Sequence, residues 1–211
     1  MARAPAAMAF EGACTLPTIW GTVHCATGRA SLRNGQRALQ SAAAGGVGLI
    51  AVEYAHWLHG KVFTSAGRPQ KQGLLRGELG LRALLSSRDG ATFAMGGAQL
   101  VRGGRLHWTL NSLSLDFVSG SLALLGEGGA FGEIGKRGVW SEERQAAARS
   151  QSLACRTIAY DVDTLFAPAW LNGVLSLCAQ RVDVGAAHAP PLQTYDMAHA
   201  WEVAFRSLQR G

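Results

Sequence analysis

Six glycines lie within thirteen residues, 126–138, and form the most concentrated chemical signal in the sequence. Glycine lets the backbone approach a phosphate closely and leaves its amides free to donate hydrogen bonds. Lys136 and Arg137 would add positive charge beside these amides. The segment therefore predicts a phosphate-holding loop, with a flexible turn as the alternative. It is not a Walker loop, because no Lys-Ser or Lys-Thr follows a correctly spaced glycine pair, and the first glycines open no dinucleotide fold at the amino terminus.

The positive charge of the chain comes mainly from arginine. The 211 residues include 20 basic and 14 acidic side chains, for a formal charge of +6 and a pI near 9.6. The guanidinium group binds phosphate through a planar fork of donors and stacks on bases, so this excess favours a nucleic-acid partner. A GC-rich genome would produce the same bias without any function.

Three arginines recur every four residues and are candidate RNA contacts. Arg29, Arg33 and Arg37 lie within residues 29–44, whose composition predicts a helix. Side chains four residues apart share one helical face. Such a basic face could follow the phosphates of a single RNA strand, whereas a plain solvated surface is the alternative.

His24 is the candidate general acid or base. Metal-independent RNA cleavage requires a group that deprotonates a 2′-hydroxyl or protonates the leaving oxygen, and imidazole can do either near neutral pH. The alternative is a packed strand residue, because His24 lies between Val23 and Cys25.

Two pairs of residues have the spacing of metal ligands. Glu53 with His56, and His199 with Glu202, lie three apart, as in carboxylate-bridged di-iron bundles. Those bundles need further inward-facing carboxylates on two other helices, which the sequence does not offer. We therefore expect no metal and no other cofactor.

The composition is that of a folded chain of one or at most two domains. Hydrophobic residues make up 48% and charged residues 16%. Residues 38–60 are the most membrane-like stretch, but Glu53, His56 and His59 interrupt it. The four cysteines form no Cys-x-x-Cys pair, which argues against a structural zinc site. With no apolar run behind Arg3 to make a secretory signal, we expect a cytoplasmic protein.

Glycine and leucine patterns divide the first half of the chain. Gly45 and Gly46 are expected to stop the first helix, and residues 47–57 are a buried strand or a short helix. Leucines then recur at helical spacing over residues 74–87, which predicts a helix with Arg76 and Arg82 off its apolar stripe.

Two turn signals predict a β-hairpin in the middle of the chain. Asp89-Gly90 would precede one arm, residues 91–101, and a glycine pair would separate it from the second, residues 105–117. Apolar residues alternate in the second arm and then change phase, which a β-bulge near Asn111 would explain.

The last 70 residues have helical character. Ser141 is expected to cap a helix that begins at Glu142. Pro190 and Pro191 then form a linker to a closing amphipathic helix over residues 193–208.

Two segments of the chain resemble the RAMP proteins, the RNA-binding subunits of CRISPR effector complexes. Residues 73–85 are similar to a segment of those proteins in which Arg-Gly is followed by a helix that ends in Arg-Ala-Leu. Residues 131–138 are similar to their glycine-rich loop. The resemblance spans roughly residues 47–140. It implies a ferredoxin-like or RRM-like core that binds guide RNA, and some members also cut the precursor RNA. The candidate RNA contacts are then Arg29, Arg33, Arg37, Arg76, Arg82, Gly132, Gly135, Lys136, Arg137 and Gly138.

We therefore expect an α+β protein with a ferredoxin-like or RRM-like core over residues 1–140, including the basic helix, and a helical extension over residues 141–211. Its expected function is to bind crRNA within a ribonucleoprotein, with RNA and other protein subunits as partners. If it is an enzyme, we expect a metal-independent endoribonuclease. The alternative is a structural accessory subunit of a large, organellar and membrane-associated complex. A small metal-dependent enzyme is the third possibility.

Overall fold

A computed structural model describes residues 2–6, 8–136, 140–149, 153–196 and 198–210. Its centre is a six-stranded sheet with the order β3-β2-β1-β4-β5-β6. Every pairing between neighbouring strands is parallel. The strands are β1 (Arg37–Gln40), β2 (Lys61–Ala66), β3 (Leu84–Ser86), β4 (Leu106–Asn111), β5 (Leu125–Glu133) and β6 (Ala154–Thr157).

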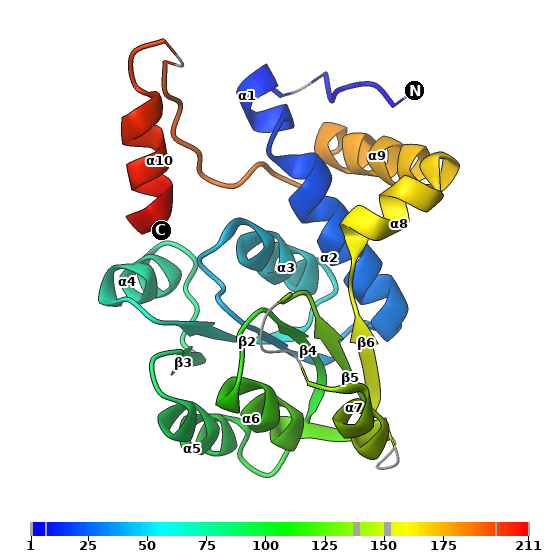
Figure 1. Ribbon diagram of the computed structural model, residues 1–211, viewed down its shortest axis with the longest axis vertical. Helices are drawn as coiled ribbons and strands as arrows, with labels where there is room; N and C mark the ends of the chain where they lie inside the picture. The colour runs from blue at the N-terminus through cyan, green and yellow to red at the C-terminus, as the bar shows by residue number, and fades with distance from the viewer. Residues whose placement is uncertain (1, 7, 137–139, 150–152, 197, 211) are drawn as a thin grey trace.

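Helices cover both faces of the sheet. In Figure 1, α2 and α3 lie on one side of the strands, and α5 and α6 on the other. The helices are α1 (Phe10–Ala13), α2 (Leu16–Ala30), α3 (Gly46–Trp57), α4 (Pro69–Gly77), α5 (Gly90–Val101), α6 (Asp116–Leu124), α7 (Glu142–Arg149), α8 (Tyr160–Phe166), α9 (Pro168–Asp183) and α10 (Trp201–Arg210).

Because both faces are covered, the central strands β1 and β4 are buried along most of their length, including their polar residues Gln40, Thr109 and Asn111. Trp108 and Leu110 of β4 pack with α2 and α3 on one face, in a cluster that includes Trp20 and Ile50. A second cluster on the other face includes Leu39 of β1 and helix residues from α5 and α6. The strand order and the parallel pairing are those of the Rossmann fold.

The predicted ferredoxin-like or RRM-like core is therefore wrong. Residues 91–101 are not a hairpin arm but most of α5. The Asp89 side chain accepts a hydrogen bond from Thr92 N at 2.6 Å, so this predicted turn is the N-cap of a helix. The change of phase at Asn111 is not a bulge, because β4 ends there and the chain continues into α6.

The predicted first helix, residues 29–44, is also wrong. Helix α2 ends at Ala30, β1 begins at Arg37, and Gly46 starts α3 instead of stopping a helix. Residues 47–57, for which strand and helix were both possible, belong to α3. The glycine-dense segment, which was predicted to be a phosphate-holding loop or a flexible turn, is strand β5 up to Glu133.

Two further predictions are correct at least in part. A helix does begin at Glu142, and Arg144 N donates a hydrogen bond to Ser141 Oγ at 3.5 Å. The closing helix is α10, which begins later than predicted.

The predicted helix over residues 74–87 is wrong. These residues form the end of α4, followed by β3.

Phe93 tests the packing of α5 against the sheet. Its side chain is fully buried and meets the Phe117 ring edge-on at 5.5 Å. Replacing it with alanine removes this burial and leaves a cavity, so we expect Phe93→Ala to lower the free energy of unfolding by about 3–5 kcal/mol. Chemical denaturation measures the change. Met95→Ala on the same helix is the control, because Met95 is 63% exposed and its loss should cost less than about 0.5 kcal/mol. Equal losses for the two variants would contradict the packing described.

Candidate functional site

The carboxyl ends of β1 and β4 mark the place where this fold binds ligands. These two strands are neighbours at the centre of the sheet, and the chain leaves them toward opposite edges. In open parallel sheets the crevice at such a switch point is the ligand site, with one mononucleotide-binding half on each side. The first half contains β1, β2 and β3, and the second contains β4, β5 and β6.

A glycine-rich turn connects β1 to α3 at this point. Ala43, Gly45 and Gly48 occupy the three glycine positions of the G-x-G-x-x-G pattern, with alanine at the first. A Cβ atom on Gly48 would lie 2.6 Å from Ala42 O and from Ala43 Cα. Only glycine fits there, because α3 packs directly on the backbone of the turn.

The amino end of α3 is oriented to bind an anion. The first bond closing the helix runs from Leu49 N to Gly45 O at 2.9 Å. The amides that precede Leu49 in this first turn have no carbonyl partner within the helix and point outward from its end. Together with the helix dipole they favour a phosphate group beyond the turn.

A cavity of about 300 Å³ opens beside this turn. It is formed where three neighbouring strands end, because each contributes the loop that follows it. Its lining is Ala42, Ala44 and Gly45 after β1, Ala66, Gly67, Arg68 and Lys71 at the end of β2 and beyond, and Ser87 and Arg88 after β3.

The lining of this cavity is basic. Arg68, Lys71 and Arg88 contribute three positive charges, and no carboxylate is present among the described residues that line it. Arg88 Nε donates to Gly67 O at 2.7 Å, which ties its guanidinium group to the loop after β2. In this fold, an acidic residue near that loop binds a ribose 2′-hydroxyl, whereas an arginine accommodates a 2′-phosphate. The cavity therefore fits an adenosine that carries a phosphate on its ribose.

A buried polar network lies at the carboxyl ends of β1, β4 and β5. Ser41, Asn111 and Glu133 are 1%, 0% and 7% exposed. Ser41 Oγ donates to Asn111 Oδ1 at 3.1 Å, and Asn111 Nδ2 donates to Glu133 Oε2 at 2.7 Å. Burial raises the pKa of Glu133, and the hydrogen bonds from Asn111 and Gly135 oppose that rise. The network borders the second half of the crevice.

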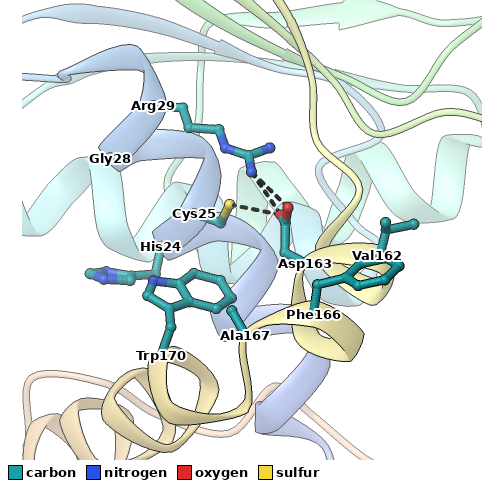
Figure 2. A pocket seen from close by; sticks show the side chains of 9 residues that line it. All are labelled: His24, Cys25, Gly28, Arg29, Val162, Asp163, Phe166, Ala167 and Trp170. Carbon is teal, nitrogen blue, oxygen red and sulfur yellow. Dashed lines mark hydrogen bonds and ion pairs between the residues drawn. The ribbon is translucent and has the colours of Figure 1, made fainter.

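A larger cavity, about 440 Å³, lies elsewhere, between α2, α8 and α9 (Figure 2). Phe166 and Trp170 line it together with His24, Cys25 and Arg29. It does not lie at the carboxyl ends of β1 and β4, so its size does not make it the nucleotide site.

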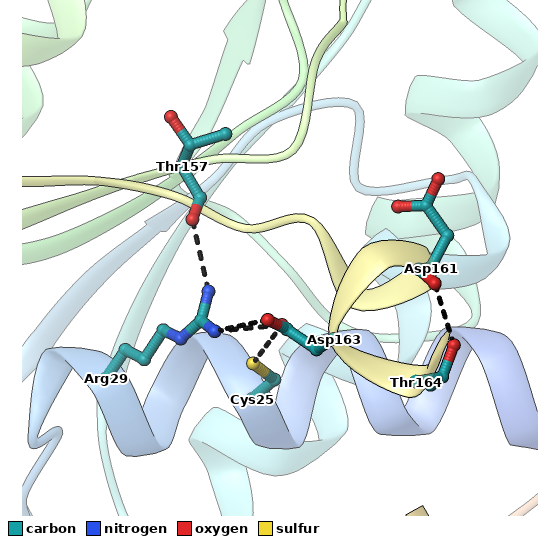
Figure 3. Close-up of polar contacts among 6 residues, drawn as sticks. All are labelled: Cys25, Arg29, Thr157, Asp161, Asp163 and Thr164. Carbon is teal, nitrogen blue, oxygen red and sulfur yellow. Dashed lines mark hydrogen bonds and ion pairs between the residues drawn. The ribbon is translucent and has the colours of Figure 1, made fainter. Parts of the chain in front are cut away.

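Three polar groups of this larger cavity, on Arg29, Asp163 and Cys25, pair with each other (Figure 3). Arg29 binds both carboxylate oxygens of Asp163, at 2.8 and 2.9 Å, and also donates to Thr157 O. Cys25 Sγ donates to the same carboxylate at 3.7 Å, and burial raises the pKa of this thiol. Arg29 thus links α2 to α8 and to the end of β6.

His24, the predicted catalytic residue, is half-buried between α2 and α3. Its ring stacks on Trp20 with centroids 4.9 Å apart, and its Nδ1 lies 3.2 Å from Tyr54 Oη. Burial, and then the charge of Arg181, lower its pKa. These contacts make His24 part of the packing between the two helices.

The residues predicted to contact RNA do not gather at one surface. Arg29 lies in the last turn of α2, Arg33 is exposed in the following loop, and Arg37 begins β1, with Nη1 bonded to Val101 O at 3.3 Å. The three therefore share no helical face.

The remaining predicted contacts are also dispersed. Arg76 is exposed on α4, and Arg82 is exposed before β3. Gly132 and Gly135 lie at and after the end of β5, and Lys136 forms an ion pair with Asp161 of α8. Arg137 and Gly138 lie outside the described residues.

The metal-like pairs do not form a centre. Among the residues that the structure describes, no group of three or more His, Cys, Asp or Glu side chains could hold a metal ion. Glu53 contacts His188 instead of acting with His56. Within the same ranges, no helix has both the length and the apolar character needed to cross a membrane.

The basic cavity was missed from the sequence, although one signal was available. A short strand, a turn that contains Gly45 and a helix that contains Gly48 fit the dinucleotide-binding pattern, with these glycines at its second and third glycine positions. The first glycine position of the pattern is occupied by Ala43, so the sequence does not match the full motif. The pair Gly45 and Gly46 is also typical of the end of a helix. Arg68, Lys71 and Arg88 carry no local signal, because only the parallel strands bring them together.

The chain resembles segments of known polyketide synthases. No family model matches it. It is 33% identical over 217 residues to the reducing polyketide synthase hmp8 of Hypomyces subiculosus, a match that covers all of this chain and 9% of the relative. It is 31% identical over 217 residues to the highly reducing polyketide synthase frbB of a Dothideomycetidae species, covering 99% and 8%. The chain thus spans less than a tenth of the length of these curated relatives.

Solved structures agree with these matches. The CurK enoyl reductase superposes with a TM-score of 0.87 and 29% identity, covering 98% of this chain and 61% of that one. The nucleotide-binding subdomain of the enoylreductase domain of PpsC from Mycobacterium tuberculosis gives a TM-score of 0.72 and 28% identity, covering 86% and 99%.

These findings overturn the predicted family and function. The resemblance to RAMP proteins is wrong, because the relatives reported above are polyketide synthases and the two solved structures are from enoyl reductases. A guide-RNA-binding role with RNA as partner is therefore wrong, and the structural accessory role in an organellar complex is unsupported as well.

Gly48 tests the contact on which the turn depends. An alanine there would force α3 away from the turn, so we expect Gly48→Ala to lower the free energy of unfolding by about 1–3 kcal/mol. Gly73→Ala on α4 is the control, since a Cβ there meets nothing within 4 Å and should stabilise the helix by about 0.5–1 kcal/mol. Chemical denaturation of both variants decides the point, and a Gly48→Ala protein as stable as the parent would contradict the described packing.

Proposed function

We propose that this chain is the NADPH-binding part of an enoyl reductase domain that works within a polyketide synthase. The basic cavity at the carboxyl ends of β1, β2 and β3 is the observation that carries the proposal. The sequence relatives and solved structures described above support the reaction class.

The residues at the crevice fit NADPH in three places. The turn at Gly45 and the first amides of α3 suit the pyrophosphate. Arg68, Lys71 and Arg88 suit the 2′-phosphate, which distinguishes NADPH from NADH. The ends of β4 and β5, with Asn111 and Glu133, border the half of the crevice that receives the nicotinamide ribose.

The chain's own contribution to the reaction is binding and orientation. When bound, NADPH would supply a hydride to the double bond of the enoyl group. The basic cavity holds one end of the dinucleotide by charge, and the turn before α3 holds its middle by backbone amides. Fixing both leaves the other end a limited set of positions over β4 and β5, which is how an enzyme aligns reacting atoms.

We also propose that the protein works in the cytoplasm. Cys14, Cys25 and Cys178 form no disulfide bond, which is the usual state of cysteines in a reducing compartment.

Replacing Arg88 tests the proposed cofactor. Its guanidinium group would form charge-assisted hydrogen bonds with the 2′-phosphate, so we expect Arg88→Ala to weaken NADPH binding by about tenfold or more. NADH has no such phosphate, and its affinity should change by less than about twofold. Isothermal titration calorimetry of the 211-residue chain with each dinucleotide measures both effects.

Arg76→Ala is the matched control, because Arg76 is also an exposed arginine, on the helix that carries Lys71, but does not line the cavity. The NADPH affinity of the Arg76→Ala variant should stay within about twofold of that of the parent chain. The proposal fails if Arg88→Ala weakens both dinucleotides equally, or if the parent chain binds neither.

A further inference from the structure

Asn111 is the centre of the buried network, and all four of its hydrogen-bonding positions are used. Its Oδ1 accepts from Ser41 Oγ at 3.1 Å and from Leu113 N at 3.3 Å. Its Nδ2 donates to Leu113 O at 2.6 Å and to Glu133 Oε2 at 2.7 Å. An amide side chain offers two donors and two acceptor positions, so Asn111 is fully satisfied and fixed in orientation.

Glu133 ties this amide to the turn that follows β5. Its Oε1 accepts from Gly135 N at 2.6 Å while its Oε2 accepts from Asn111. The approach is so close that a Cβ on Gly135 would lie 2.7 Å from Oε1. One carboxylate therefore fixes the turn after β4, through Asn111, and the turn after β5, through Gly135.

Ser41 extends the network to the glycine-rich turn. It directly follows β1, and its backbone N donates to Leu110 O at 3.1 Å. Its hydroxyl then joins the first residue of that turn to Asn111. The three strand ends on which both halves of the dinucleotide would rest are thus linked by hydrogen bonds.

We propose that Glu133 is a positioning residue for the nicotinamide end of the cofactor, acting through Asn111 and Gly135. This inference rests on the proposed function. The 2′-phosphate end lies over β2 and β3, away from the network, and is held by the basic cavity. Glu133 therefore governs how the second half of the dinucleotide is held, and leaves the first half unaffected.

Glu133→Gln changes the hydrogen bonding of this side chain but nearly preserves its shape. Asn111 Nδ2 and Gly135 N are both donors, and glutamine presents one acceptor oxygen and one NH₂ group. One of the two donors must lose its acceptor and face another donor, so one turn is released although the side-chain volume is nearly unchanged.

The test compares NADPH with adenosine 2′,5′-bisphosphate, a fragment that contains the 2′-phosphate end but no nicotinamide. We expect Glu133→Gln to weaken NADPH binding by about tenfold, as measured by calorimetry on the full chain, and to leave the fragment within about twofold. Glu127→Gln is the matched control, because Glu127 is exposed on the same strand at its amino end. It should alter neither ligand.

The outcomes separate the inference from the proposed function. If the parent chain binds neither ligand, the proposed function itself fails. If the parent chain binds both ligands and Glu133→Gln weakens both affinities equally, Glu133 has only a structural role and the inference is overturned. The inference is also overturned if neither affinity changes. If Glu133→Gln does not fold, Ser41→Ala, which removes one donor to Asn111, must weaken NADPH binding selectively, and an unchanged or uniform effect overturns the inference.

Discussion

The close packing of helix α3 on the turn that precedes it is the constraint on which the site depends. Gly48 lies so near the backbone of Ala42 and Ala43 that no side chain fits between them. This contact places the amino end of α3 directly over the end of β1, at the point where the strand order reverses. The free amides of the first helical turn therefore face the crevice, where an anion can use them.

The parallel sheet gives the two sides of this crevice different chemistry. On one side the segments that follow β2 and β3 carry the exposed Arg68 and Arg88, together with Lys71 in the first turn of α4. On the other side the ends of β4 and β5 carry Asn111 and Glu133, which are buried and held by hydrogen bonds. Charges at a surface suit recognition of a phosphate, whereas fixed buried dipoles suit the placement of a reacting group. This difference is the reason why we place the 2′-phosphate end of the cofactor on the first side and its nicotinamide end on the second.

The sequence predicted parts of the fold that depend on local patterns. The helix at Glu142 follows from its capping residue, and the closing helix from its periodicity. The sheet topology was missed because short apolar segments of strand and helix have similar patterns, so α5 was interpreted as a hairpin arm after the turn signal at Asp89. The hydrogen bond from Thr92 N to the Asp89 side chain caps α5. Asp89 and Gly90 are equally common in β-turns, so the residue types alone do not distinguish a helix start from a turn.

The candidate site was less predictable than the fold. Alanine at position 43 interrupts the glycine pattern of the turn, and the glycines of β5, which predict a phosphate-holding loop, lie in a strand. Arg88 follows β3 and Lys71 lies on α4, and nothing in their local sequence indicates that parallel pairing of β2 with β3 brings them to one cavity.

A crystal structure of the chain with NADP⁺ would show directly where the cofactor binds. We expect the 2′-phosphate within hydrogen-bonding distance of Arg88, between Gly67 and Ser87, and the pyrophosphate at the amino end of α3. A nucleotide bound in the cavity beside Arg29 and Trp170, or elsewhere away from the strand ends, would contradict this expectation.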